Sequence, residues 1–234
     1  MRRATRPSCW CRSGGSYPFV CNPVCMSLVA FDFDGTLSES EMTVLLAEQH
    51  GVTDAVAEIT QQAMNDELDY AESLRRRVGL LEGLSATEAQ AAFDAVRLRP
   101  GAGDLIAALS AAGVETAILT GGFRRGVEAA LDAAGVSVDH IISNQIIISD
   151  DRVTGTVEGP LIEGTKDDAL ANLVATTGVT ETVAVGDGAN DLPMLAAADL
   201  SIGFDPHPAV ASSCDLLVED VAALRQTFEE HNLL

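Results

Sequence analysis

The sequence predicts an α/β protein whose mainly parallel sheet is flanked by helices. Short apolar runs, typical of buried strands, alternate with longer segments that have helical periodicity. The predicted strands cover residues 27–31, 114–119, 182–185, 200–202 and 216–218, and the predicted helices cover 104–112, 124–134, 166–176, 190–197, 207–213 and 220–230. With 234 residues, of which 47% are hydrophobic, the chain is long enough to bury a core around such a sheet.

Residues 39–96 interrupt this alternation. They are rich in Ala, Glu, Gln and Leu, show helical patterns without a strand, and include a helix start at residues 85–88. The sheet resumes near residues 99–101. We therefore expect residues 26–38 and 97–234 to form the core, and residues 39–96 to form a helical cap domain inserted after the first strand.

A β-hairpin is the second departure from the alternation. Two β-like runs, at residues 146–149 and 153–157, are joined by Asp150, Asp151 and Arg152. Aspartate is common in tight turns because its side chain can bond the nearby backbone. We therefore predict a hairpin within residues 145–158.

The first 25 residues differ in composition from the remainder of the chain. They contain four of the five cysteines, the one tryptophan and four arginines, but no acidic residue. A zinc knuckle is one interpretation, although the cysteine spacing is not that of a standard structural zinc site. We favour a true start at Met26, directly before the first predicted strand, and expect residues 1–25 to be disordered or absent in the native protein.

Acidic residues dominate the charge of the chain. The formal net charge is −21, and it becomes −25 without the four arginines of residues 1–25. Repulsion on this scale destabilises a compact fold in dilute buffer, whereas molar salt shortens the Debye length to about 3 Å and screens it. Because the acids are spread along the chain, we interpret them as adaptation to a salt-rich cytoplasm rather than as a surface for a basic partner. We expect neither nucleic acid nor a membrane as a partner.

Polar residues follow the ends of several predicted strands. Asp32 and Asp34 follow the first strand, Thr120 the second and Asp187 the third. Ligands of an open α/β sheet bind at the carboxyl ends of its strands, so these residues should meet at one site. One aspartate there can attack phosphorus, while the other protonates the leaving oxygen and later deprotonates water.

The same site needs positive charge. Lys166, the only lysine in the chain, can stabilise the charge on a transferring phosphoryl group. Two aspartates and a phosphate also require a hard cation with oxygen ligands, for which Mg²⁺ is suited, and Asp187 supplies a further oxygen. Thr120 offers a hydroxyl and the amide of Gly121 to a phosphate oxygen. The residues therefore predict a magnesium-dependent phosphoryl site.

The motifs occur in an order that resembles a known superfamily. Asp-x-Asp-Gly-Thr at 32–36, Thr-Gly-Gly at 120–122, Lys166 and Gly-Asp-Gly-x-Asn-Asp at 186–191 are similar to the haloacid-dehalogenase superfamily of aspartate-nucleophile phosphatases, over residues 27–203. The resemblance implies a Rossmann-like core. It implies that Asp32 is the nucleophile and that Asp34 is the acid and base. It also implies that Thr120, Gly121 and Lys166 bind phosphate, and that Asp191 supports Lys166. The metal would be bound by Asp32, Asp187 and the Asp34 carbonyl.

A narrower resemblance concerns the inserted segment. Residues 64–81 closely resemble the cap of the phosphoserine phosphatases. By position, this likeness implies that Glu41 meets the amino group of the substrate, Arg77 its carboxylate and Asn190 its phosphate. An acid and a planar arginine fork suit the two charges on serine. Two alternatives stay open, since Glu39 competes with Glu41 and Arg77 can instead form a surface ion pair.

The chain departs from that family at two positions. Gly35 and Thr120 stand where the family usually has serine. Met64 and Tyr70 are expected to pack in the core of the cap. The four histidines match no motif and are expected to be structural or exposed.

The predicted function is hydrolysis of O-phosphoserine to serine and phosphate, the last step of serine biosynthesis, by a cytoplasmic monomer or homodimer. One alternative is a phosphatase for another small phosphomonoester, such as a sugar or polyol phosphate. Another is a mutase or phosphotransferase that passes the phosphoryl group to an alcohol. A regulator that binds metal through the amino-terminal cysteines is the non-enzymatic alternative.

Overall fold

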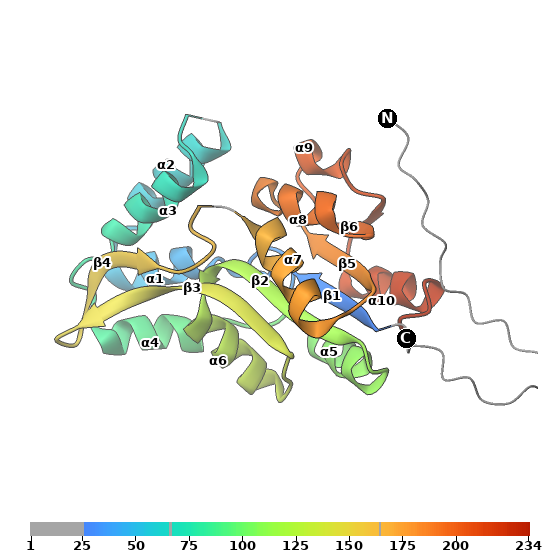
Figure 1. Ribbon diagram of the computed structural model, residues 1–234. Coiled ribbons are helices and arrows are strands. Elements are labelled where there is room, and N and C mark those ends of the chain that lie inside the picture. The colour runs from blue at the N-terminus through green and yellow to red at the C-terminus, as the bar shows by residue number, and fades with distance from the viewer. Residues whose placement is uncertain (1–25, 66, 164) are drawn as a thin grey trace, which may run out of the picture.

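The predicted parallel sheet is present in the computed structural model, which describes residues 26–65, 67–163 and 165–234 (Figure 1). Its strand order is β4-β3-β2-β1-β5-β6-β7. The strands are β1 (Ser27–Phe31), β2 (Glu115–Phe123), β3 (His140–Ser149), β4 (Arg152–Glu158), β5 (Glu181–Gly186), β6 (Leu200–Phe204) and β7 (Leu216–Val218). All neighbours pair in parallel except β3 and β4. The expectations for residues 1–25 lie outside the described residues and stay predictions.

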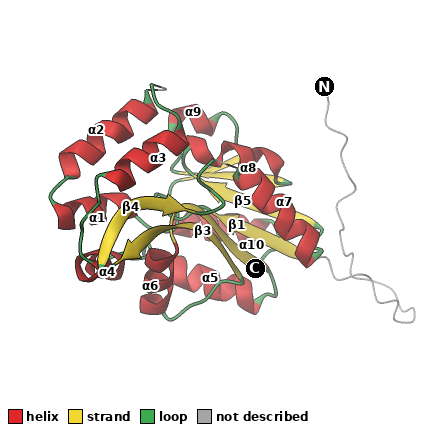
Figure 2. Ribbon diagram, turned by 60° about the vertical axis from the view of Figure 1, so that its left-hand side comes forward, coloured by secondary structure: helices red, strands yellow, loops and turns green. Residues whose placement is uncertain are grey.

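Helices cover both faces of the sheet (Figure 2). The core helices are α5 (Ala102–Ala111), α6 (Arg124–Ala134), α7 (Lys166–Thr177), α8 (Leu192–Ala197), α9 (Pro208–Ala211) and α10 (Val221–Glu230), with a short 3₁₀ turn η1 (Ala189–Asp191). Successive residues of β1 face opposite sides, as a strand requires. Leu28 and Ala30 pack with α7 and α8. Phe31 lies on the other side, where its ring meets that of Phe228 in α10 edge to face, with the ring centroids 6.2 Å apart. No described helix is both long and apolar enough to cross a bilayer.

The segment after β1 is helical, as the sequence predicts. It forms α1 (Met42–His50), α2 (Thr53–Met64), α3 (Tyr70–Gly79) and α4 (Ala86–Asp94). The two connections to the sheet lie side by side, because Ser38 bridges Leu98 and the amide of Arg99 donates to the Leu37 carbonyl at 2.8 Å. One buried apolar cluster runs from the sheet into these helices, and Phe93 of α4 meets Phe123 of β2 edge to face.

The predicted hairpin is present, but its first strand begins earlier than expected. β3 starts at His140, and its first half pairs in parallel with β2 before its second half pairs antiparallel with β4. The turn is made by Asp150 and Asp151, whose φ angles are 49° and 59°. Two successive residues with positive φ are typical of a two-residue hairpin turn, so Arg152, placed in the connection by the sequence, instead begins β4.

The start of α4 provides a test of local stability. The Ser85 hydroxyl accepts from the Glu88 amide at 3.2 Å, and the Glu88 carboxylate accepts from the Ser85 amide at 3.2 Å, which forms the capping box. We expect Ser85→Ala to lower the free energy of unfolding by about 1 kcal/mol, because the cap that satisfies the first turn is lost. Denaturant unfolding in molar salt measures this. Ser110→Ala, at an exposed position within α5, is the control, and an equal loss in the two variants would contradict the prediction.

Candidate active site

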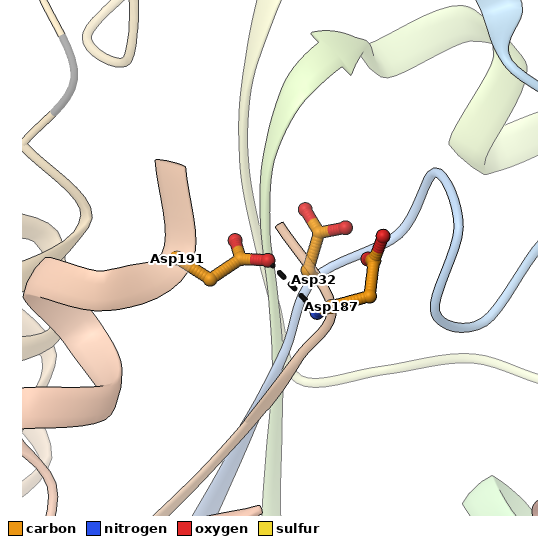
Figure 3. Close-up of side chains that lie close together, drawn as sticks. All are labelled: Asp32, Asp187 and Asp191. Atoms are coloured by element: carbon orange, nitrogen blue, oxygen red, sulfur yellow. Dashed lines mark hydrogen bonds between the residues drawn. The ribbon is translucent and has the colours of Figure 1, made fainter. Parts of the chain in front are cut away.

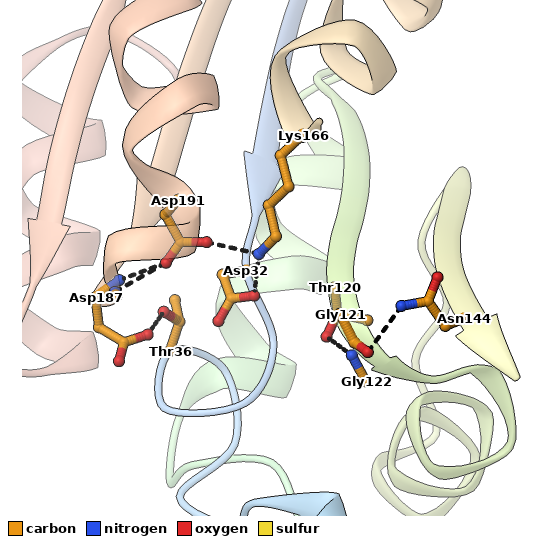
Figure 4. Close-up of polar contacts among 10 residues, drawn as sticks. Asp32, Thr36, Thr120, Gly121, Gly122, Asn144, Lys166, Asp187 and Asp191 are labelled. Carbon is orange, nitrogen blue, oxygen red and sulfur yellow. Dashed lines mark hydrogen bonds and ion pairs between the residues drawn. The ribbon is translucent and has the colours of Figure 1, made fainter. Parts of the chain in front are cut away.

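The predicted site residues converge at the carboxyl edge of the sheet (Figure 4). Asp32 follows β1, Asp187 follows β5, and Thr120 lies in the last part of β2. Lys166 is the first residue of α7. Parallel strands end at the same edge, so residues separated by more than 130 positions in the sequence meet in one place.

A buried lysine joins two of the aspartates. The ammonium nitrogen of Lys166 lies 2.5 Å from Oδ1 of Asp32 and 2.6 Å from Oδ1 of Asp191, and the lysine side chain is only 3% exposed. Burial opposes the lysine charge, but the carboxylates of Asp191 and Asp32 outweigh it and raise the pKa of Lys166. The lysine is therefore a permanent cation at this site.

The second carboxylate oxygen of Asp191 is hydrogen-bonded to the loop that follows β5. Its Oδ2 accepts hydrogen bonds from the amides of Asp187 at 3.0 Å and Gly188 at 2.9 Å. A Cβ at Gly186 would lie 2.6 Å from Asp191 Cγ, so this approach requires glycine. Because both of its oxygens are bonded to protein groups, Asp191 acts as the support for Lys166 and for the Asp187 loop.

Three carboxylates form an acidic cluster (Figure 3). Asp32, Asp187 and Asp191 each offer an oxygen, and these oxygens lie within 4.8 Å of one another. Burial, followed by the neighbouring Asp191, raises the pKa of Asp187 to about 6 and that of Asp32 well above its usual range. Crowded, poorly solvated carboxylates with raised pKa values are what an oxygen-ligated divalent cation would neutralise, so the donor set fits a metal.

The turn after Asp32 places further groups around this cluster. The Thr36 hydroxyl donates to Asp187 Oδ1 at 2.8 Å. Gly35 has φ of +89°, and a Cβ there would lie 2.6 Å from Asp187 Oδ2. The position that departs from the usual serine therefore leaves no space for a side chain against Asp187. The backbone of residues 34–36 is held against the carboxylate that follows β5.

Asp34 faces the Thr120–Gly122 loop, an irregular stretch of β2 over which the pairing with β3 shifts register. A Cβ at Gly122 would lie 2.5 Å from Asp34 Oδ2. Burial, followed by the charge of Glu41, raises the pKa of Asp34 well above its usual range, while the Met42 amide, 3.4 Å away, opposes the rise. A raised pKa favours the protonated form of this carboxyl group, and that form can protonate a leaving group.

The loop that contains Thr120 is held by internal hydrogen bonds. The Thr120 hydroxyl oxygen accepts from the Gly122 amide at 2.9 Å, which leaves the hydroxyl proton free to be donated. The fully buried Asn144 donates to the Gly121 carbonyl at 3.0 Å and accepts from the Leu161 amide at 3.0 Å. Sequence reasoning missed Asn144, although a polar residue inside an apolar strand was a signal.

The three arginines of α3 have different surroundings. Arg75 pairs with Glu163 and Arg76 with Glu72, both at the surface. Arg77 is buried, no described carboxylate lies within ion-pair distance of it, and its Nε has no partner among the described residues. Its one hydrogen bond within the described chain is to the Thr43 hydroxyl at 3.4 Å. The structure thus contradicts a surface ion pair for Arg77 and leaves a buried guanidinium available to an anion.

Glu39 and Glu41, the two candidates for the amino group of the substrate, have different surroundings. Glu39 pairs with Arg99 at 3.5 Å. Glu41, directly before α1, has an exposed side chain, and its charge raises the pKa of both Asp34 and Asp187. Glu41 directly precedes Met42, whose amide lies 3.4 Å from Asp34 Oδ1, whereas Glu39 lies beside Arg99. The predicted phosphate contact Asn190 is half-buried in η1, in the same loop as Asp187.

Of the two residues expected in the core of the inserted helices, one is exposed and the other packs there only partly buried. Met64 is 62% exposed at the end of α2, so its prediction as core is wrong. Tyr70 packs partly buried against the apolar cluster, but its hydroxyl lies against Gly121. The sequence pattern identifies Tyr70 only as an aromatic residue for packing.

Comparison with known proteins identifies the family. A family model described as haloacid dehalogenase-like hydrolase matches residues 29–196. The chain is 53% identical over 210 residues to a phosphoserine phosphatase from Halobacterium salinarum, covering 89% of this chain and 100% of that protein. It is 42% identical to the phosphoserine phosphatase SerB2 of Mycobacterium tuberculosis over 80% of this chain, but it spans only 46% of that longer protein.

A solved structure agrees with the sequence comparisons. A phospho-aspartyl intermediate analogue of phosphoserine phosphatase superimposes with a TM-score of 0.80 at 33% identity, covering 88% of this chain and 98% of that one. The fold and most of the length of the chain are thus shared with a phosphoserine phosphatase. The chain belongs to the haloacid dehalogenase-like hydrolases.

Proposed function

We propose that the protein hydrolyses O-phosphoserine to serine and inorganic phosphate with Mg²⁺, in the cytoplasm, as the last step of serine biosynthesis. The observation that carries the proposal is the buried Arg77 guanidinium, which has no carboxylate partner among the described residues. It lies on α3, whose first residue, Tyr70, contacts Gly121 beside Thr120. A substrate with a phosphate and a carboxylate can contact both Thr120 and Arg77. The chain's similarity to phosphoserine phosphatases supports the same substrate.

The first half-reaction uses Asp32 and Asp34. A carboxylate oxygen of Asp32 attacks phosphorus, the new bond between this oxygen and phosphorus forms, and the bond from phosphorus to the serine oxygen breaks. Asp34 gives its proton to the departing oxygen, which its raised pKa permits. Lys166, the Thr120 hydroxyl and the Gly121 amide hold the phosphoryl oxygens, and Asn190 lies nearby.

The second half-reaction returns Asp32 to its carboxylate form. Asp34, now ionised, takes a proton from water while the water oxygen attacks phosphorus. The bond between Asp32 and phosphorus breaks, and inorganic phosphate leaves. The helices of residues 39–96 act as the cap, which excludes water during the first half-reaction.

The metal and the serine group are bound by separate residues. The carboxylates of Asp32 and Asp187 and the Asp34 carbonyl would hold Mg²⁺, which supplies positive charge against the phosphoryl oxygens. Arg77 binds the substrate carboxylate, because its fork matches the two oxygens. Glu41 binds the ammonium group at the open side of the site. A panel of phosphomonoesters separates this substrate from sugar and polyol phosphates, and added alcohol acceptors reveal any phosphotransfer.

Replacement of Asp32 tests the nucleophile. We expect Asp32→Asn to lower kcat by at least about a thousandfold, because an amide cannot form the aspartyl-phosphate. Initial rates with phosphoserine measure the loss, and circular dichroism checks that the fold is retained. Near-normal turnover in a folded variant would refute covalent catalysis through Asp32.

Replacement of Arg77 tests the substrate. We expect Arg77→Ala to lower kcat/KM for phosphoserine by about a hundredfold, since a buried charge-assisted contact is lost. The same variant should change kcat/KM for p-nitrophenyl phosphate, which has no carboxylate, by less than about threefold. Arg76→Ala, on the same helix but paired with Glu72 at the surface, is the control and should behave like the wild type. Equal losses on both substrates would argue against a carboxylate clamp.

The pH dependence of metal binding tests the acidic cluster. Below the Asp187 pKa of about 6, protons compete with Mg²⁺ for this carboxylate. We therefore expect the dissociation constant of Mg²⁺ to rise about tenfold for each pH unit below 6, because binding then releases a proton. An aspartate with the ordinary pKa of 3.8 would show no such rise until the pH approached that value. Calorimetric titration from pH 7.5 to 5 measures the effect, and a constant affinity over that range would contradict it.

A further inference from the structure

The side chain of Tyr70 extends from α3 and places its hydroxyl against the Thr120–Gly122 loop. A Cβ built on Gly121 would lie 1.6 Å from the hydroxyl oxygen of Tyr70 and 2.8 Å from the ring carbon that carries it. The hydroxyl therefore occupies the space that any side chain at position 121 would take. Tyr70 is the first residue of α3, so the contact joins the inserted helices directly to the candidate phosphate loop.

The proton of the Tyr70 hydroxyl is not donated to any described residue. The hydroxyl forms no hydrogen bond with any other residue that the structure describes. Burial raises the pKa of Tyr70 to about 12, while the charges of Lys166 and Arg77 act in the opposite direction. The phenol thus keeps its proton at physiological pH. The half-buried hydroxyl has no acceptor among the described residues, so an oxygen of a ligand at this loop can accept its hydrogen bond.

The Tyr70 hydroxyl lies beside residues of the candidate active site. The residue after Gly121 is Gly122, where a Cβ would lie 2.5 Å from Asp34 Oδ2, so the hydroxyl and the Asp34 carboxyl group lie against adjacent residues of this loop. Arg77 follows Tyr70 by seven residues, or about two helical turns, which places both side chains on one face of α3. That face therefore presents a neutral donor toward the loop and a cation farther along the helix.

We propose that Tyr70 donates a hydrogen bond to a phosphoryl oxygen of the substrate bound at the Thr120–Gly122 loop. This inference rests on the proposed function, because it assumes a phosphomonoester ligand. It adds a contact from the inserted helices to a phosphoryl group otherwise held by the core. Tyr70 then binds the phosphate of the substrate, whereas Arg77 binds its carboxylate.

Tyr70→Phe tests the proposal, because it keeps the ring and removes only the hydroxyl. In the full-length protein with Mg²⁺ and molar salt, we expect the dissociation constant of inorganic phosphate to rise about tenfold, as for a lost hydrogen bond to a charged group. The KM values for phosphoserine and p-nitrophenyl phosphate should rise in parallel, since the two share the phosphoryl group. Unchanged phosphate binding, or a loss confined to phosphoserine, would overturn the proposal.

Tyr17→Phe is the matched control, because the chain has only two tyrosines. It should leave phosphate binding and both KM values unchanged. The Tyr17→Phe protein also provides a test without any change at position 70, since Tyr70 is then the one tyrosine that absorbs. Phosphate should produce a tyrosine difference spectrum in this protein, and its absence would count against the contact.

The two proposals fail in different ways. A wild-type protein that binds phosphate but does not hydrolyse phosphoserine would refute the proposed function, while calorimetric titration with phosphate would still decide the role of Tyr70. A wild-type protein that hydrolyses phosphoserine, with Tyr70→Phe equal to it in phosphate binding, would refute only the role of Tyr70.

Discussion

The buried pairing of Lys166 with Asp32 and Asp191 is the interaction on which the site depends. These residues come from the start of α7, the end of β1 and the turn η1, and all three are almost completely buried. Removing one partner from such a cluster leaves an unpaired buried charge, which costs about 3–5 kcal/mol. The three backbone segments are therefore constrained relative to one another. The same cluster that orients the nucleophile also fixes the edge of the sheet at which the substrate binds.

Ion pairs at the surface of this acidic protein are screened by salt more strongly than the buried pairs are. The surface pairs Arg76–Glu72, Arg124–Glu128 and Arg225–Glu229 are spaced four residues apart on helices, with side chains about half exposed. Such pairs contribute about 0.3–0.5 kcal/mol each, and molar salt screens them further. The Lys166 cluster is shielded from solvent, so salt weakens it much less. A protein adapted to high salt can thus lose most of its surface attraction and still retain the charges that catalysis needs.

The sequence predicted the site better than it predicted the contacts that hold the site together. Asp32, Thr120 and Asp187 could be placed because each follows an apolar run of the sequence, although β2 continues past Thr120 in the structure, and strand ends share one edge of a parallel sheet. The supporting role of Asn144 could not be predicted, because it depends on Gly121 and Leu161, which lie 23 and 17 residues away. For Tyr70, helical spacing indicates a face of α3 but not how far a hydroxyl reaches, so only packing could be predicted. Met64 follows the family pattern, yet it ends α2 in solvent.

The position of the only lysine follows from the geometry of the cluster. Arginine takes the place of lysine everywhere else in the chain, including Arg77, whose planar fork suits a carboxylate. At position 166 the cation must approach two separate oxygens, at 2.5 Å and 2.6 Å, in a space where the side chain is 3% exposed. An ammonium is a compact point charge that can meet both, whereas a guanidinium is larger and donates in a fixed plane. Replacement of lysine by arginine, which the remainder of the chain accommodates, is therefore excluded at the one position where charge must be concentrated between Asp32 and Asp191.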